Sequence, residues 1–455
     1  MKKISGRTVF LLILTAILAA GALTFFVQYF LSADSWVKFS GSPHLYTGAN
    51  LNCGVVTDRS GEQLLDTRQG RAYSDDAATR KAFLHLLGDR DGYISAPMLG
   101  AYADQMIGYN KLTGLYGAAT GGAATSLTIS AAAQKTAMQA LDSKRGTVAV
   151  YNYKTGEILC AVSAPSYDPD NVPDIAGDTT GAYDGVYVNR FFDATYTPGS
   201  IFKLVTSAAA IDNIPDIYQQ TFECNGRQII GGQEIICSGV HGTTNFSEGL
   251  AHSCNIVFGN IAVQLGAKTL EQYARRIGLT SRFDCAGYRT RAGVVDLSKA
   301  DDGDVAWAGI GQYSVEVNPY SYLRYMGILG GGGTAAEPYL VASITEGDKT
   351  LYSAEASSTG QLVNAETAQK MATMMHYNVV SVYGSYQFPN LYVCAKSGTA
   401  EQEGKSAHAT FAGFIRDDDY PLAFVVFLEN AGAGSAVAAP IAGQVLNACI
   451  AAMQK

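Results

Sequence analysis

Ser200 and Lys203 are the first residues whose types and spacing could do chemistry. They form an S-x-x-K motif in TPGSIFKLVTSAAAID, which is predicted to be a turn that leads into a helix. Residues i and i+3 share one helix face, so the lysine amine can reach the serine hydroxyl. A serine hydroxyl becomes a good nucleophile when a neighbouring base takes its proton, and a lysine can do so if burial and nearby charge lower its pKa. Alone the motif is weak, because about one or two such matches are expected by chance.

Ser253-Cys254-Asn255 is a second candidate, and it is the only S-x-N motif in the chain. A second hydroxyl can pass a proton between the base and the leaving amine, while the amide of Asn255 holds the substrate backbone. Taken alone, this motif is better explained as two polar residues on the flank of a helix.

Lys396-Ser397-Gly398-Thr399 is a third candidate, at the end of an apolar run that is predicted to be a strand. A lysine in this position can meet a substrate carboxylate, and Gly398 is expected to let the substrate backbone approach closely. Backbone N–H groups on such a strand can stabilise an oxyanion.

The order of the three motifs is more specific than any one of them. S-x-x-K, S-x-N and K-[ST]-G in this order resemble the penicillin-binding protein and serine β-lactamase superfamily. The stretches GVVTDRSGEQLL, NRFFDATYTPGSIFK and AKSGTAE resemble the class B penicillin-binding proteins in particular. We therefore identify the chain as similar to the D,D-transpeptidases of cell-wall synthesis.

This resemblance implies a role for each motif and no cofactor. Ser200 would be the acylated nucleophile and Lys203 its base, with the N–H groups of Ser200 and Thr399 as the oxyanion hole. Ser253 and Asn255 would transfer protons and bind the peptide. Lys396, Ser397 and Thr399 would hold the terminal carboxylate of a stem peptide that ends in D-Ala-D-Ala. The resemblance also implies covalent inhibition by β-lactams and, because no glycosyltransferase segment is recognisable, a membrane glycan polymerase as a partner.

The N-terminus predicts a membrane anchor. Lys2, Lys3 and Arg7 precede the apolar stretch VFLLILTAILAAGALTFFVQYF, and no further charge occurs before Asp34. This stretch is long enough to cross about 30 Å of hydrocarbon as a helix. The basic flank is expected to remain in the cytoplasm, so that the rest of the chain lies outside. Residues 1–33 are thus predicted to be a cytoplasmic stub and anchor.

The remaining sequence predicts two further parts. Residues 34–125 are expected to form a short pedestal that ends in the low-complexity linker Gly117–Ser126, and residues 126–455 the transpeptidase domain. In the latter, GTVAVYNYKTGEILCAVSAP predicts a hairpin, and LYVCA, HATFAGFI and PLAFVVFLE predict three strands. One helix is expected from about Asn245 through AHSCNIVFGNIAVQL, and another over 437–453. These elements predict an α+β fold, with an antiparallel sheet flanked by helices.

The net charge and the cysteines indicate which partners, metal sites and disulfides are expected. A net charge of −8 argues against a nucleic-acid partner. The eight cysteines form no C-x-x-C pair, so no metal site is expected. The segment CNGRQIIGGQEIIC predicts a hairpin centred between Ile230 and Gly231, which would place Cys224 opposite Cys237 and allow a disulfide. Two free thiols are the alternative.

Other functions remain open from the sequence. A β-lactamase would need a positioned deacylating water, and no E-x-x-x-N-type loop is recognisable between Ser253 and Lys396. A D,D-carboxypeptidase would transfer the acyl group to water. A catalytically silent scaffold or sensor would be expected to lose one of the three motifs, and none is lost. The sequence does not distinguish a role in elongation, division or sporulation.

Overall fold

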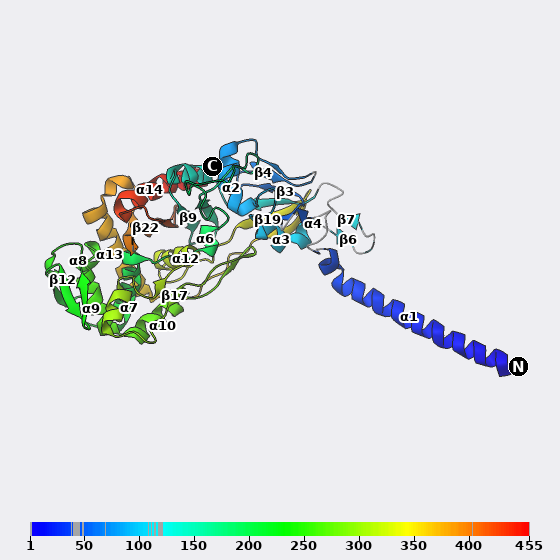
Figure 1. Ribbon diagram of the computed structural model, residues 1–455, viewed down its shortest axis with the longest axis horizontal. Coiled ribbons are helices and arrows are strands. Elements are labelled where there is room, and N and C mark those ends of the chain that lie inside the picture. The colour runs from blue at the N-terminus through cyan, green and yellow to red at the C-terminus, as the bar shows by residue number, and fades with distance from the viewer. Residues whose placement is uncertain are drawn as a thin grey trace.

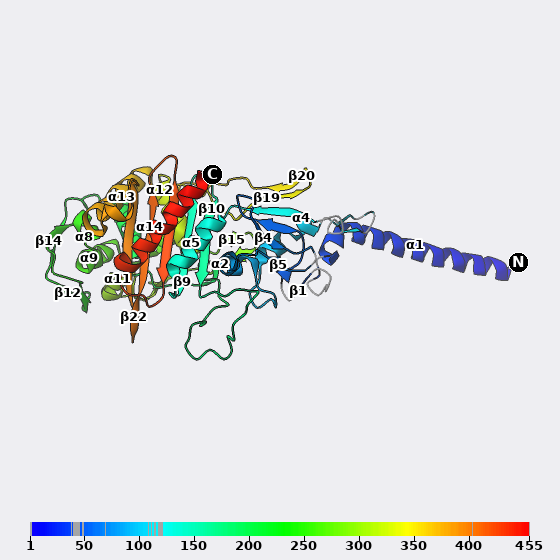
Figure 2. The same cartoon turned by 90° about the horizontal axis from the view of Figure 1, so that it is seen from above.

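The computed structural model describes residues 2–37, 39, 46–47, 50–68, 70–107, 109–110, 112, 115–116, 122–402 and 404–454. A long N-terminal helix projects from a body that is built around two main sheets (Figures 1 and 2). The sheet of six short strands lies next to the helix and is called the smaller sheet. The sheet of five longer strands lies in the part of the body farther from the helix and is called the larger sheet.

Helix α1 (Lys2–Val37) contains the predicted anchor. Its span Ser5–Ala33 has a mean hydropathy of 2.6, and its most apolar stretch is not buried against the rest of the chain. Water disfavours so large an exposed apolar surface, whereas lipid accommodates it, so the helix fits a single transmembrane span. Helix α14 (Gly434–Met453) is also long and apolar, but 44% of it is buried and it packs on the larger sheet as a core helix.

The smaller sheet has six strands in the order β20-β19-β8-β3-β4-β5. All its pairings are antiparallel except that of β8 with β3. The strands are β3 (Val55–Thr57), β4 (Gln63–Asp66), β5 (Ala72–Tyr73), β8 (Ala124–Leu127), β19 (Val341–Glu346) and β20 (Lys349–Ser353). The segment before Ser126 is therefore completed by two strands from the later sequence. Part of the predicted linker, residues 117–121, lies outside the described residues, and Ser126 lies within β8.

Short elements accompany this sheet. They are the helices α2 (Ala77–Leu87), α3 (Pro97–Ala101) and α4 (Ala103–Ile107), and the two-residue strands β1 (Tyr46–Thr47), β2 (Asn50–Leu51), β6 (Tyr109–Asn110) and β7 (Leu115–Tyr116). Asp76 caps α2, because its side chain accepts a hydrogen bond from the Ala78 N–H.

The larger sheet is antiparallel, in the order β10-β9-β23-β22-β21. Its strands are β9 (Gly146–Asn152), β10 (Ile158–Ala164), β21 (Val393–Gln402), β22 (Lys405–Ile415) and β23 (Leu422–Leu428), so the predicted hairpin and three strands are confirmed. Every residue of β9, β10 and β23 is buried. Both faces must therefore be covered. Helices α5 (Ala131–Leu141) and α14 pack on one face and α12 (Pro319–Gly330) on the other (Figure 2).

The remaining elements lie outside the two main sheets, and some of them contact the edge strand β21. The helices are α6 (Arg190–Asp193), α7 (Lys203–Asn213), α8 (Phe246–Ala251), α9 (Asn255–Leu265), α10 (Ala267–Arg276), α11 (Asp302–Gly309) and α13 (Ala365–Asn378), with short turns η2 (Gly199–Phe202), η3 (Val379–Tyr383) and η4 (Ser385–Gln387). The small strands are β11 (Thr221–Cys224), β12 (Arg227–Ile230), β13 (Gln233–Ile236), β14 (Gly242–Asn245), β15 (Asp284–Cys285), β16 (Tyr288–Arg289), β17 (Val294–Val295) and β18 (Val315–Glu316).

The single helix predicted from Asn245 onward is two helices. Asn245 caps α8 as expected, since its side chain accepts a hydrogen bond from the Glu248 N–H. The helix then breaks at Ser253, whose φ of +57° is incompatible with a continuous right-handed helix. Helix α9 begins with Cys254 as its N-cap residue. The break sets the direction of the Ser253 side chain.

Candidate active site

Ser200 lies in the short turn η2, directly before helix α7, as the sequence predicted. Gly199 has a φ of +57°, and a Cβ atom there would lie 2.6 Å from the carbonyl oxygen of Thr399. Only glycine permits this approach. The contact holds Ser200 beside strand β21, so S-x-x-K and K-[ST]-G, which are almost 200 residues apart, meet at one place.

Lys203 connects the first two motifs. Its side chain has no exposed surface. Its Nζ atom lies 2.9 Å from Ser200 Oγ, 3.1 Å from Ser253 Oγ, 2.7 Å from the Ser253 carbonyl oxygen and 2.7 Å from Asn255 Oδ1. The two shortest contacts are with oxygens that can only accept hydrogen bonds. A neutral amine has two N–H donors for these oxygens and one lone pair, which is then available to the Ser200 hydroxyl.

The orientation of Asn255 supports this pattern. Its Nδ2 donates to the carbonyl oxygen of Ile236 at 2.7 Å, which leaves Oδ1 facing Lys203. Burial is the main cause that lowers the pKa of Lys203 well below its ordinary value, and repulsion by Lys396 lowers it further. The role of Ile236 could not be predicted from the sequence, because it depends on a main-chain carbonyl, which every type of residue carries.

Ser253 lies between the two lysines. Its Oγ atom is 3.1 Å from Lys203 Nζ and 3.1 Å from Lys396 Nζ. This position results from the left-handed backbone at Ser253, which turns the hydroxyl toward α7 and β21. The three motifs thus share one continuous hydrogen-bond network.

Lys396 is completely buried on strand β21. Besides Ser253 Oγ, its Nζ contacts Tyr383 Oη at 3.1 Å and the Ser397 carbonyl oxygen at 2.9 Å. Burial lowers the pKa of Lys396 to about 7. Tyr383 Oη also accepts from the Ser397 N–H at 3.1 Å. Sequence analysis missed Tyr383, because it is one of 27 tyrosines and lies in no motif.

Gly398 has a packing role that the sequence did not predict. A Cβ atom at this position would lie 2.2 Å from Thr410 Oγ1 and 2.9 Å from the Pro198 carbonyl oxygen. The space that a side chain would need is therefore occupied by the chain itself, and glycine is required here for packing β21 against β22 and the turn before Ser200. The close approach of the substrate backbone to Gly398 stays a prediction.

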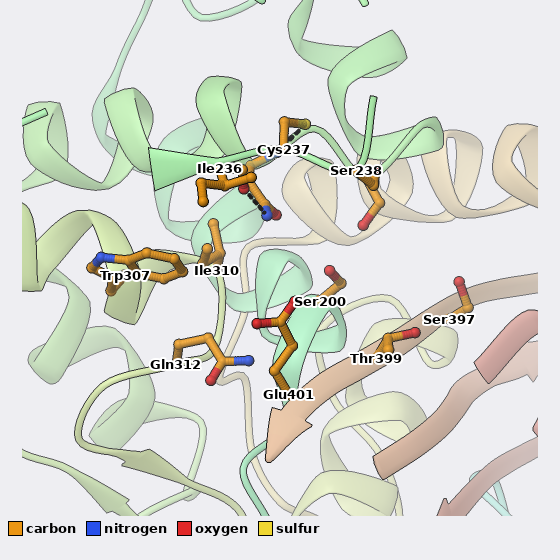
Figure 3. Close-up of a pocket in the computed structure, with 12 residues that line it drawn as sticks. Ser200, Ile236, Cys237, Ser238, Trp307, Ile310, Gln312, Ser397, Thr399 and Glu401 are labelled. Carbon is orange, nitrogen blue, oxygen red and sulfur yellow. Dashed lines mark hydrogen bonds between the residues drawn. The ribbon is translucent and has the colours of Figure 1, made fainter. Parts of the chain in front are cut away.

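A pocket of about 400 Å³ opens above these residues. Figure 3 shows Ser200 between two walls, with Ile236, Cys237 and Ser238 on one side and Ser397 and Thr399 on β21 on the other. The other lining residues are Ser253, Asn255, Trp307, Ile310, Gln312 and Glu401. Neither Lys203 nor Lys396 lines the pocket, so both lysines act from beneath its surface.

The predicted disulfide between Cys224 and Cys237 is not formed, and both thiols are free. The predicted register is wrong, because Ile230 pairs with Gln233 and the hairpin turns at Gly231-Gly232. Cys224 lies in strand β11 instead and pairs with Gly242 of β14. The two cysteines are nevertheless close in space, since both lie beside His241.

Comparison with known proteins defines the class to which this fold and site belong. Residues 146–447 match the family model of the penicillin binding protein transpeptidase domain. Peptidoglycan D,D-transpeptidase PbpA of Mycobacterium tuberculosis (strain H37Rv) is 26% identical over 333 residues, which cover 67% of each chain. Stage V sporulation protein D of Bacillus subtilis (strain 168) is 29% identical over 324 residues, which cover 66% of this chain and 48% of the relative.

Solved structures show the same fold. The D,D-transpeptidase domain of a peptidoglycan glycosyltransferase from Eggerthella lenta superposes with a TM-score of 0.76 at 24% identity, over 88% of this chain and 98% of that one. The ceftriaxone acyl-enzyme complex of penicillin-binding protein A from M. tuberculosis has a TM-score of 0.76 at 23% identity, over 87% and 98%. The predicted α+β transpeptidase fold is confirmed.

The chain belongs to the penicillin-binding protein transpeptidase family, since the family model matches well over half of its residues. The resemblance to class B penicillin-binding proteins, which the sequence motifs indicated, is thereby confirmed.

Proposed function

We propose that this protein is a serine-type peptidoglycan D,D-transpeptidase that cross-links stem peptides through an acyl-enzyme on Ser200. The observation that carries the proposal is the position of the buried Lys203 amine, 2.9 Å from Ser200 Oγ and 3.1 Å from Ser253 Oγ, in surroundings that favour its neutral form. Family membership and the names of the relatives support the reaction class.

In the acylation step, Ser200 Oγ attacks the carbonyl carbon of the penultimate D-alanine while its proton moves to Lys203 Nζ. The developing oxyanion is stabilised by the N–H groups of Ser200 and Thr399, which border the same pocket. The C–N bond to the terminal D-alanine then breaks. The leaving amine takes a proton that reaches it through the Ser253 hydroxyl, which lies within hydrogen-bond distance of Lys203.

In the transfer step, the amine of a neighbouring strand attacks the acyl carbonyl carbon. A new amide bond forms, the ester bond to Ser200 breaks, and the proton lost by the acceptor amine returns to Ser200 Oγ through Lys203. The cycle therefore consumes no cofactor and leaves the enzyme unchanged. One terminal D-alanine is released for each cross-link.

Ser397 and Thr399 are the groups of the third motif that line the pocket, so we assign them the direct contacts with the terminal carboxylate of the donor peptide. Lys396, buried behind them, contributes its charge and its hydrogen bond to Ser253. Asn255 lines the pocket as well and is assigned to the peptide backbone. A β-lactam carboxylate would occupy the same position as that of the peptide.

Helix α1 is proposed to anchor the enzyme with its N-terminus in the cytoplasm, because the basic residues lie on that flank. The transpeptidase domain would then work on the outer side of the membrane, where glycan strands are assembled. A membrane glycan polymerase is the expected partner, since it would supply those strands.

Intact mass measurement after incubation with penicillin tests the proposal. The expected result is one adduct of the mass of the antibiotic, mapped by peptide sequencing to Ser200, absent from Ser200→Ala and stable for many minutes. An adduct on another residue contradicts the assignment. An adduct that disappears within seconds indicates a β-lactamase. Supplying a D-Ala-D-Ala peptide with and without an acceptor amine separates transpeptidation from a carboxypeptidase, which releases D-alanine at the same rate in both cases.

A further inference from the structure

Four side chains with strong metal affinity converge beside the active site. They are Cys224, Cys237, His241 and Cys254, and their ligand atoms all lie within 4.8 Å of one another. Among the described residues, no other set of three or more cysteines, histidines and carboxylates converges in this way. The three cysteines are buried, and His241 is partly buried.

Three distances between these atoms match a tetrahedral zinc site. Cys237 Sγ lies 3.8 Å from Cys254 Sγ, and His241 Nδ1 lies 3.4 Å from Cys224 Sγ and 3.5 Å from Cys237 Sγ. For a tetrahedron with Zn–S bonds of about 2.3 Å and Zn–N bonds of about 2.0–2.1 Å, the sulfurs are about 3.8 Å apart and sulfur and nitrogen about 3.5 Å apart. A disulfide would need about 2.05 Å between the sulfurs. The arrangement thus fits a shared ion better than a covalent bond.

The ligand set also selects the metal. Three thiolates and one imidazole are a soft set that favours zinc over magnesium or calcium. With four protein ligands there is no open position for a substrate or water, which is the property of a structural rather than a catalytic site. The backbone N–H of Asn255 lies 3.3 Å from Cys237 Sγ, as is common for a hydrogen bond that stabilises a bound thiolate.

We propose that Cys224, Cys237, His241 and Cys254 bind a structural zinc ion. Cys224 ends β11, Cys237 follows β13, and His241 precedes β14, so three ligands come from the small strands that form one wall of the pocket. The fourth, Cys254, lies between Ser253 and Asn255 in the S-x-N motif.

The position of the site gives the ion a specific task. It fastens the segment of the small strands to the start of helix α9 and so holds the left-handed backbone at Ser253. Asn255 is tied to the same wall by its side-chain hydrogen bond to the Ile236 carbonyl oxygen at 2.7 Å. The zinc ion therefore positions the two polar residues of the motif without touching the substrate. Zinc binding does not depend on the proposed acyl transfer, but its effect on acylation does.

The sequence predicted no metal site, because the cysteines form no C-x-x-C pair. The proposed zinc site argues against that prediction. The ligands are instead spaced as C-x₁₂-C-x₃-H-x₁₂-C. With this spacing, the strands between the ligands bring the four side chains together. In a C-x-x-C motif the tight turn itself does so. The zinc-ligand pattern can be recognised in the sequence only when His241 is considered together with the cysteines.

Metal analysis of the full-length chain in detergent, purified under reducing conditions, tests the proposal. We expect about one zinc per chain after exhaustive dialysis, and the absorption bands of tetrahedral, thiolate-bound cobalt when Co²⁺ replaces the zinc. Chain that binds neither zinc nor cobalt, chain that binds iron instead, or a disulfide among these cysteines would overturn it. These measurements use the unaltered protein, so they do not depend on whether a variant folds.

Variants then locate the site and its effect. Cys224→Ala and His241→Ala are expected to lose the zinc, melt at a lower temperature and react with penicillin at least about tenfold more slowly, as for loss of a supporting contact at a catalytic site. Cys449→Ala, in a buried cysteine far along the chain, and His252→Ala, whose ring stacks on His241 at 5.9 Å, should keep it. Zinc retained in the Cys224 and His241 variants would place the metal elsewhere. Normal zinc content with no acylation of the unaltered chain would instead count against the proposed function alone.

Discussion

Replacing Lys396 by methionine is expected to make the protein more stable at pH 7 while impairing acylation. In the folded chain, burial lowers the pKa of Lys396 from 10.5 to about 7. In the unfolded chain the same amine keeps its ordinary pKa. At pH 7 the native state must therefore either give up the proton or bury a charge, and this costs free energy that a methionine does not require.

The magnitude follows from the size of the shift. A difference of about 3.5 pKa units at about 1.4 kcal/mol each, evaluated at pH 7, corresponds to a cost on the order of 4 kcal/mol. The hydrogen bonds of Lys396 offset part of it at about 1 kcal/mol each. Ser253 Oγ keeps its contact with Lys203, and Tyr383 Oη keeps the Ser397 N–H, so only the Ser397 carbonyl loses a donor outright. The expected net gain is roughly 1–3 kcal/mol.

The sign of the pH dependence provides a sharper test. Between pH 7 and 10.5 the unfolded chain holds a proton on Lys396 that the folded chain does not, so this residue makes the wild type more stable as the pH rises. The advantage of the methionine variant is therefore greatest at and below pH 7. It shrinks by about 2 kcal/mol between pH 7 and pH 9. Lys203 titrates differently in the variant, because Lys396 also lowers its pKa, whereas the remaining buried groups titrate alike in both proteins and cancel in the difference.

Urea denaturation of the full-length chain in detergent at pH 7 and pH 9 measures this difference. The fluorescence of Trp307, which borders the pocket, reports on the body of the protein, and the other tryptophan, Trp36, lies in helix α1. Lys154→Met is a matched control, because the Lys154 side chain is 49% exposed and paired with Asp418. A methionine variant that is less stable at pH 7, or an advantage that does not change with pH, would show that Lys396 keeps its ordinary pKa in the folded state.

Three further predictions concern the chemistry of the network. Lys203→Arg should slow acylation by penicillin at least about 100-fold, because a guanidinium stays protonated and cannot act as a base. A rate near that of the wild type would show that Lys203 acts only through its charge. The acylation rate of the wild type should fall as the pH decreases through the pKa of Lys203, which burial and Lys396 lower well below 10.5. Lys396→Met should move this fall to higher pH, because the repulsion between the two lysines is gone. Stopped-flow mixing at a series of pH values measures both. Tyr383→Phe should slow acylation about tenfold with little change in the melting temperature, because it removes the hydroxyl that contacts Lys396 and the Ser397 N–H; an unchanged rate would limit Tyr383 to packing.

Features encoded by short stretches of sequence were predictable. The apolar anchor, the hairpin around Lys154-Thr155-Gly156 and the three strands of β21, β22 and β23 each depend on a local pattern of apolar residues and turn residues. The same holds for the turn and helix that contain Ser200. The motif residues could be named for the same reason, since serine, lysine and asparagine in a fixed local spacing limit the chemistry that they can do.

Features that depend on pairing between distant segments were not predictable. The predicted pairing register of the hairpin that follows Cys224 differs slightly from the observed one, because the two adjacent glycines permit the turn at either position. Strands β19 and β20 join the sheet that the N-terminal strands begin, and no local pattern records that partnership. The break at Ser253 also depends on the surrounding helices and strands rather than on the preference of Ser-Cys-Asn.

By itself the sequence determined the class of reaction, because the three motifs and their order specify a serine, a base and a carboxylate-binding strand. The tertiary structure decided how these groups work. It buried both lysines and thereby lowered their pKa values, it placed Ser253 between them, and it brought Tyr383 into the network. It also gathered three cysteines and a histidine from four separate segments. Burial and proximity are properties of the packed chain, since the free energy of a charge depends on what surrounds it and not on its neighbours in sequence.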